Sequence, residues 1–408
     1  MMPTAAAAAA QNASRMSYQD LVTYLSAVFV FLGMASFIEP SPYDFISFVA
    51  IPAWLFGGVR ISRHALPFLL AWTAYETLNF IALTRWWADG HAQLYQLQSL
   101  YLFVTLIFFT LFFAERTRER MSVCMTAYAW SAAFSAFIAI VSYFELFGIP
   151  SLTTVEGRVS GTFKDPNAFG SYIPFGAALF LHALLLGHGR TVTQLCGLGL
   201  VLTGVLLSFS RGSWGATLFS LVLMSIATLL SQSQNEIRQR VLFRLLLAVG
   251  VAVIVIAIAL SQETIRDIFL NRASVTQDYD EGVTGRFGNQ LRSIPLLLDR
   301  PFGFGPLQFR KFFQIDPHNS YIGAFANGGW LAGLLWIVII ASTVFVGARL
   351  MITLSPYRAM AQVVFPSLLA LLLQGFQIDI DHWRQLYLML GMVWGLEIAR
   401  RRVQSAPS

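Results

Sequence analysis

Long apolar runs are the dominant feature of this sequence, in which segments of about twenty residues with few or no charges recur along almost the whole chain. Of its 408 residues, 56% are hydrophobic and only 12% are charged, whereas a typical soluble domain has about 25% charged residues. A run of about twenty apolar residues is what an α-helix needs to cross a bilayer. The sequence therefore predicts an all-α polytopic membrane protein, and excludes a disordered chain or a soluble repeat protein.

The apolar runs predict about twelve transmembrane helices. The first two are short and could instead form one re-entrant pair, so that the exact helix count stays open. The expected segments are residues 21–38, 44–59, 66–83, 97–114, 122–146, 168–187, 192–209, 214–231, 241–260, 320–348, 360–378 and 383–399.

The basic residues indicate the orientation of these helices. Arginines gather in alternate loops, with three in residues 116–120 and three in 400–402, whereas most acidic residues lie in the other loops. Because short loops rich in Arg and Lys remain in the cytoplasm, we expect both termini there, with residues 1–16 as a disordered tail and 400–408 as a second tail. The net charge of +6 then follows from the arginines in these cytoplasmic loops. The sequence has no continuous stripe of basic residues of the kind that binds nucleic acid.

A long loop divides the chain into two groups of helices. Residues 17–260 hold nine predicted helices and 320–399 hold three, while 261–319 form a large loop expected in the periplasm. Loops of this length are uncommon and usually functional. The stretch "QLRSIPLLL" predicts an amphipathic helix near 285–299, lying along the membrane, and a turn over Pro301–Pro306 should follow it.

Two apolar runs begin with Asp-Pro, in "FKDPNAFGSYI" and "IDPHNSYIGAF". This pattern predicts that Asp165 and Asp316 cap helices whose first residue is the proline. Capping does not explain the residues that follow, which are Asn167 in one run and His318 with Asn319 in the other. Because a helix N-terminus presents unpaired amide groups, these positions are also suited to an anion.

Several cations lie in loops that the topology places outside, against the usual bias. Arg211 is in "LSFSRGSWGA", a tight connection between two apolar runs, and Arg158, Lys164 and Arg286 are in other outer loops. Two interpretations remain open: an arginine paired with a carboxylate or reaching to the interface, and a phosphate clamp, since guanidinium binds phosphate through two parallel hydrogen bonds.

Other polar residues give weaker signals. Glu76 is a lone carboxylate within a predicted membrane helix, where it could pair with an arginine or lie near the interface. Asp381, His382 and Arg384 form a turn that we expect to be a solvated loop cluster and not a metal site. The two cysteines fall in apolar runs and support neither a disulfide framework nor a metal site.

Four motifs occur in order over about residues 155–335: "GRVSGTFKDPNAFGSYI", "SFSRGSWGA", "TGRFGNQLRSIPLLLDRPFGFGPLQF" and "DPHNSYIGAFANGGWLAG". Together they resemble the O-antigen ligase and Wzy-type polymerase superfamily of bacterial surface-polysaccharide enzymes. Members of that superfamily often have Gly-x-x-Gly where this chain has Gly329 followed by Gly333. The difference concerns helix packing at that point and not the active site.

The resemblance implies a GT-C-like glycosyltransferase in the bacterial inner membrane. Its donor would be a glycan on undecaprenyl pyrophosphate, and its acceptor a sugar hydroxyl of lipid A-core or of another glycan at the periplasmic face. Arg211 and Arg286 would contact the diphosphate, and His318 would take the acceptor proton, since free imidazole titrates at about pH 6.5. The other candidates for substrate binding are Arg158, Lys164, Asn167 and Asn319. No metal or cofactor is expected, because arginines can neutralise the leaving group.

Two other classes of function are compatible with a polytopic membrane protein. A transporter for an anionic solute should have ionisable residues deep in its helices and inverted repeats, but only Glu76 lies at depth and no internal repeat is present. A non-catalytic subunit of an export complex has no need for outward arginines and a histidine. The transferase is therefore favoured, while these residues do not decide between ligase and polymerase.

Overall fold

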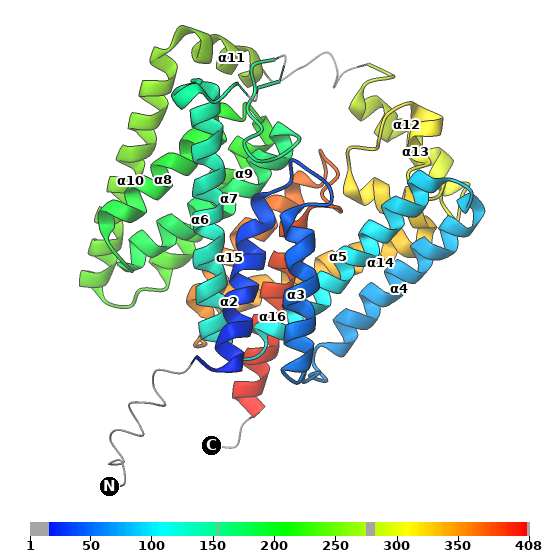
Figure 1. Ribbon diagram of the computed structural model, residues 1–408, viewed down its shortest axis with the longest axis horizontal. Coiled ribbons are helices and arrows are strands. Elements are labelled where there is room, and N and C mark those ends of the chain that lie inside the picture. Colours follow the sequence, from blue (N-terminus) through cyan, green and yellow to red (C-terminus); the bar gives the residue numbers. More distant parts are fainter. Residues whose placement is uncertain (1–15, 152, 155, 275–281, 406–408) are drawn as a thin grey trace.

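The computed structural model describes residues 16–151, 153–154, 156–274 and 282–405. These residues form helices joined mostly by short connections (Figure 1), with two isolated bridges and no strand among them. The all-α prediction is therefore confirmed for the described residues. The predicted N-terminal tail lies almost entirely outside them.

Each predicted membrane segment overlaps one long observed helix, although several of these helices begin or end outside the predicted bounds. Within the described residues, seven helices are long and apolar enough to cross a membrane and four more are apolar but shorter, so twelve spans remain a prediction. The helices that match the segments are α2 (Tyr18–Phe31), α3 (Pro42–Phe56), α4 (Leu66–Leu83), α5 (Gly90–Phe113), α6 (Thr117–Tyr143), α7 (Pro166–Leu186), α8 (Thr191–Leu207), α9 (Arg211–Leu230), α10 (Asn235–Ser261), α14 (Ser320–Ile352), α15 (Arg358–Gln374) and α16 (Arg384–Ser405).

The predicted outer loop is partly helical. The expected amphipathic helix is present as α12 (Arg286–Leu298), whereas α11 (Glu263–Ala273) and the short α13 (Phe309–Phe313) were not predicted. Short 3₁₀ turns complete the secondary structure at Leu32–Met34, Thr84–Trp86 and Leu146–Gly148.

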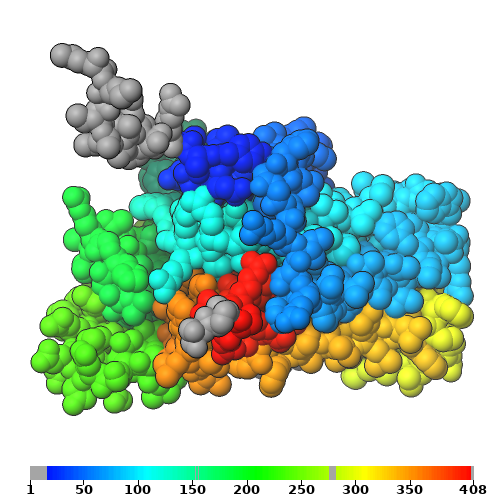
Figure 2. Space-filling view, turned by 90° about the horizontal axis from the view of Figure 1, so that it is seen from below, coloured from blue at the N-terminus to red at the C-terminus, as the bar shows by residue number. Residues whose placement is uncertain are grey.

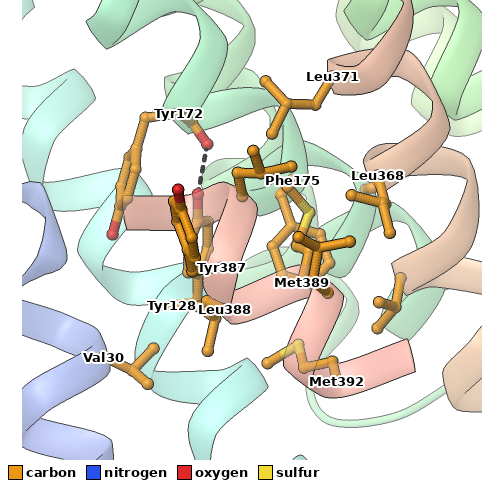
Figure 3. Packing of buried hydrophobic residues seen from close by; sticks show 14 of the residues in the cluster. Val30, Tyr128, Tyr172, Phe175, Leu368, Leu371, Tyr387, Leu388, Met389 and Met392 are labelled. Atoms are coloured by element: carbon orange, nitrogen blue, oxygen red, sulfur yellow. Dashed lines mark hydrogen bonds between the residues drawn. The ribbon is translucent and has the colours of Figure 1, made fainter. Parts of the chain in front are cut away.

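The centre of the molecule is packed around α16 (Figure 3). Tyr387 and Met389 of α16 lie among Leu368 of α15 and the stacked rings of Tyr128 and Tyr172, from α6 and α7. The Tyr128 hydroxyl donates to the Tyr172 carbonyl oxygen over 2.8 Å. This hydrogen bond satisfies a hydroxyl that is buried away from water. This core fixes α6, α7 and α15 relative to one another.

Arginines that the sequence predicts to be cytoplasmic lie at one end of the bundle. Arg116 pairs with Asp20 at the start of α2 over 2.7 Å, and Arg402 donates to the carbonyl oxygen of Ala114 over 2.9 Å. Figure 2 views the molecule from this end, where the last turns of α16 (red) reach the surface. Helices α7, α9 and α14 begin at the opposite end (Figure 1), and the candidate site lies there.

Helix α14 is interrupted at Gly329, which has a φ of 82°. The predicted turn after α12 docks against this interruption: the Phe304 amide donates to the Ala326 carbonyl oxygen over 2.7 Å, and the Trp330 amide donates to the Pro301 carbonyl oxygen over 2.9 Å. A Cβ at Gly329 would lie only 2.3 Å from that Pro301 oxygen. The outer loop is thereby attached to the first turns of α14.

Candidate functional site

The two Asp-Pro motifs have different structures. Asp165 caps α7 as predicted, because its carboxylate accepts from the amides of Asn167 and Ala168 over 2.8 and 3.0 Å. The prediction for Asp316 is wrong, since the Arg310 guanidinium holds its two oxygens over 3.0 and 2.8 Å.

The actual cap of α14 is Asn319, so the helix begins at Ser320. The Asn319 side-chain oxygen accepts from the amides of Tyr321 and Ile322 over 3.0 and 3.1 Å. Asn319 was a candidate for substrate binding. In this structure its side-chain oxygen caps the helix, and its side-chain nitrogen Nδ2 donates to the Phe376 carbonyl oxygen over 3.1 Å.

His318 is held by a carboxylate from a distant part of the chain. Its φ of 45° lies in the left-handed region, which is uncommon for residues other than glycine. Asp379 accepts from the backbone amides of His318 and Asn319 over 3.1 and 3.0 Å, and its carboxylate oxygen lies 3.6 Å from His318 Nδ1. Burial and the nearby charge of Asp381 raise the pKa of the Asp379 carboxyl. Asp379 thus contacts both the strained backbone and the ring of His318.

Helix α12 positions two candidates at once. Arg286 is its first residue, and Nη1 donates to the Gln377 carbonyl oxygen over 3.0 Å. One turn later, Gln290 Nε2 donates to the carbonyl oxygens of Pro317 and His318 over 3.0 and 3.2 Å. Helix α12 therefore carries Arg286, the predicted diphosphate contact, and also bonds the backbone at His318, the predicted base.

Arg211 is the first residue of α9, and Nη1 donates to the Ser274 carbonyl oxygen over 3.0 Å. The carbonyl oxygen of the next residue, Gly212, accepts from Gln374 Nε2 over 2.7 Å. Phe209, just before the helix, has a left-handed φ of 46°. Backbone strain of this kind concentrates at functional sites.

One short segment, residues 374–379, therefore bonds Arg286, the backbone of His318 and Gly212, the residue that follows Arg211. Gln374 bonds the start of α9, Gln377 bonds Arg286, and Asp379 bonds the backbone of His318. Sequence reasoning brought the three candidates together only through the family resemblance and did not name this segment. A carboxylate following an apolar run was the only available signal for Asp379.

The cluster that follows is not the solvated turn that was predicted. The Asp381 and His382 side chains are only 18% and 23% exposed. Asp381 accepts from the Tyr95 hydroxyl over 2.7 Å and contacts His382 Nδ1 over 3.1 Å, and Arg384 pairs with Asp44 over 3.1 Å. The prediction is wrong because the connection between α15 and α16 folds inward and meets polar partners on α5 and α3.

Asp381 and His382 stabilise each other's charged forms. Burial raises the pKa of the Asp381 carboxyl, but hydrogen bonds from His382 and Tyr95 outweigh burial and lower it overall. Burial lowers the pKa of the His382 imidazole, but the bond to Asp381 outweighs burial and raises it overall. Their contact therefore favours an ion pair directly beside the segment that carries Asp379.

Glu76 interacts electrostatically with His382 and Asp381, and it forms no ion pair with an arginine among the described residues. Its buried carboxylate accepts from Gln96 Nε2 over 2.8 Å, which joins α4 to α5.

The remaining candidates separate into two places. Arg158 donates to the Asn167 side-chain oxygen over 2.6 Å and to the Ser208 carbonyl oxygen over 3.1 Å, so both Arg158 and Asn167 adjoin the connection that leads into α9. Lys164 instead pairs with Glu39 over 3.0 Å, and both side chains are 52% exposed.

Comparison with known families supports the resemblance noted from the motifs. Residues 196–337 match the family model Wzy_C, described as O-antigen ligase, while no curated protein matches the chain. The matched region runs from α8 into α14 and contains Arg211, Arg286 and His318. It supports an enzyme of the ligase or polymerase type in a multi-pass membrane protein. Residues 196–337 therefore match an O-antigen ligase domain, and this match supports the resemblance of the chain to the O-antigen ligase and Wzy-type superfamily.

Proposed function

We propose that this protein is a glycosyltransferase that moves a glycan from undecaprenyl pyrophosphate to a sugar hydroxyl of lipid A-core, at the periplasmic face of the inner membrane. The observation that carries this proposal is the meeting of the first residues of α9 and α12 with the segment before α14. All three contact residues 374–379. The site therefore combines two arginines with a histidine–carboxylate pair.

The arginines act on the leaving group. When the bond between the sugar carbon and the pyrophosphate oxygen breaks, negative charge develops on the diphosphate. Arg211 and Arg286 are each fixed by a backbone carbonyl oxygen, and guanidinium groups stabilise such charge strongly where water is partly excluded. In this proposal the arginines take the part that a divalent metal plays elsewhere, and the reaction needs none.

His318 acts on the acceptor. Its neutral imidazole removes the proton from the acceptor hydroxyl as that oxygen attacks the sugar carbon. Asp379, 3.6 Å from Nδ1, orients the ring. Burial raises the pKa of its carboxyl, but the positive charge of the imidazolium that forms favours the ionised carboxylate. That carboxylate then stabilises the imidazolium, as carboxylates do for catalytic histidines in hydrolases. The His318 side chain is 43% exposed, so the imidazolium can then release its proton to water.

The outer face of α12 suits the prenyl chain of the donor. Buried Gln290 and Ser293 lie on one side of the helix, while an apolar stripe on the other side is 42–69% exposed. The Arg286 guanidinium lies 5.0 Å from the Phe287 ring, at the start of this stripe. A chain leaving the diphosphate would therefore meet apolar surface at once. The stripe consists of Phe287, Leu291, Ile294 and Leu298, which share a helix face.

A deletion strain tests the proposed function. We expect its lipopolysaccharide gel to show lipid A-core without polymer, restored by the intact gene but not by Arg286→Ala at equal protein level. Core carrying single repeat units would identify a polymerase. An unchanged gel, with unchanged exopolysaccharide, would contradict both.

A further inference from the structure

A second polar site lies at the opposite end of the bundle, where α8 and α10 begin and α7 ends. A cleft of about 570 Å³ opens there, and its polar lining consists of Thr191, Glu236, Gln239, Arg240 and Arg244. We propose that this cleft binds the phosphodiester headgroup of an anionic membrane lipid. The proposal does not depend on the glycosyltransferase site.

The two arginines lie one turn apart on α10 and face the same cleft. Arg244 is fixed in place, because Nη1 donates to the Leu185 carbonyl oxygen over 3.0 Å. Its guanidinium also lies against Gly187, where a Cβ would be only 2.6 Å from Nη1. Arg240 has no hydrogen bond or ion pair to another described residue. One arginine is thus held in position and the other is available to a ligand.

The net charge of the cleft lining is suited to a ligand with a single negative charge. Two arginines and Glu236 leave a net charge of +1 on the lining, and a phosphodiester carries a charge of −1. Helix α8 begins at Thr191 without a side-chain cap, so the positive end of its dipole adds to the attraction. The Thr191 hydroxyl and the Gln239 amide supply further hydrogen-bond donors.

The cleft also continues into apolar surface. Phe243 and Leu247 complete its wall, and the outer face of α10 beyond them is exposed and apolar, with Leu246, Val249 and Val253 between 51% and 69% exposed. A phosphate site that leads onto such a surface fits an amphiphile with acyl chains. Basic pockets between membrane helices bind anionic headgroups in the same way.

Lipid retention by the full-length protein tests the proposal. Native mass spectrometry in a neutral detergent, after addition of phosphatidylglycerol or phosphatidylcholine, should show one phosphatidylglycerol retained at least tenfold better than phosphatidylcholine. Arg240→Gln should abolish that preference. Arg238→Gln is the matched control, because Arg238 is exposed on the same helix and does not line the cleft.

Glu236→Gln provides an independent arm, because removal of the opposing carboxylate should increase retention about threefold. Equal losses in Arg240→Gln and Arg238→Gln would show general charge attraction and overturn the site. Competition by millimolar inorganic phosphate that fully displaces the lipid would reassign the cleft to a free anion. No gain in Glu236→Gln would also contradict the proposal.

Discussion

At the scale of single residues, Asp379 couples the backbone of His318 to its ring. Its carboxylate accepts from two successive amides and also faces Nδ1. The left-handed φ of His318 costs free energy, typically about 1–3 kcal/mol, and these hydrogen bonds offset that cost. The Asp379 side chain therefore stabilises the backbone conformation of His318 and also takes part in the proposed proton transfer.

Asp379→Asn separates these two roles. An amide oxygen can still accept from the backbone, but it cannot stabilise an imidazolium as a carboxylate does. We expect transfer to fall roughly 10²-fold or more, while the protein keeps its thermal midpoint within a few degrees. Transfer rates with a prenyl-linked donor measure this, with Asp267→Asn as the matched control because the Asp267 side chain is 62% exposed and lies outside the proposed site. Full activity would remove Asp379 from the mechanism.

His382 makes stability depend on pH. Its folded-state pKa is raised overall, so its ion pair with Asp381 stabilises the fold fully below the unfolded pKa of about 6.5. This stabilisation is lost as the pH rises through the higher folded value. The difference in thermal midpoint between the intact protein and His382→Asn should therefore be largest near pH 6 and shrink in alkali. A difference that grew with pH would contradict the assignment.

At the scale of elements, the helices of the long apolar runs could be predicted because such runs reveal them without reference to the rest of the fold, whereas α11 and α13 lie outside these runs. The first residue of α14 could not be predicted, because both Asp316 and Asn319 can cap a helix. Arg310 bonds both carboxylate oxygens of Asp316, so Asn319 is the cap. The inward course of residues 375–383 likewise depends on partners far away in sequence, such as Tyr95. The family motifs named Arg211, Arg286 and His318, but Asp379 lies beyond those motifs.

Gly329 is the element-scale test. At a φ of 82°, with a Cβ only 2.3 Å from the Pro301 oxygen, Gly329→Ala should destabilise the protein by about 1–3 kcal/mol. It should also loosen the turn that holds α12 against α14. Gly250→Ala in α10 is the control, since nothing lies within 4 Å of its added Cβ. Thermal unfolding in detergent compares the two variants, and equal midpoints would show that the interruption is not needed.

At the scale of the whole molecule, the two ends have different chemistry. One end gathers Arg116, Arg402 and the arginine-lined cleft of α10, and the other carries the proposed transferase site. A donor delivered from the periplasm requires that site to face outward. The arginine distribution supports this orientation through the positive-inside bias.

Topology reporters test the orientation. An enzyme active only in the periplasm should be active when fused at about residue 275, and inactive when fused at about residue 235. The reverse pattern would place the proposed site on the cytoplasmic side and contradict transfer at the periplasmic face.

Transfer by the purified protein is the most direct measurement of the central claim. Proteoliposomes holding the protein, an undecaprenyl-pyrophosphate-linked glycan and lipid A-core should yield ligated product, also in excess chelator. Arg211→Ala and Arg286→Ala should each abolish product, and Arg→Lys should restore little, because lysine lacks the guanidinium fork. Absence of product from the intact protein, or unchanged product from both alanine variants, would contradict the account.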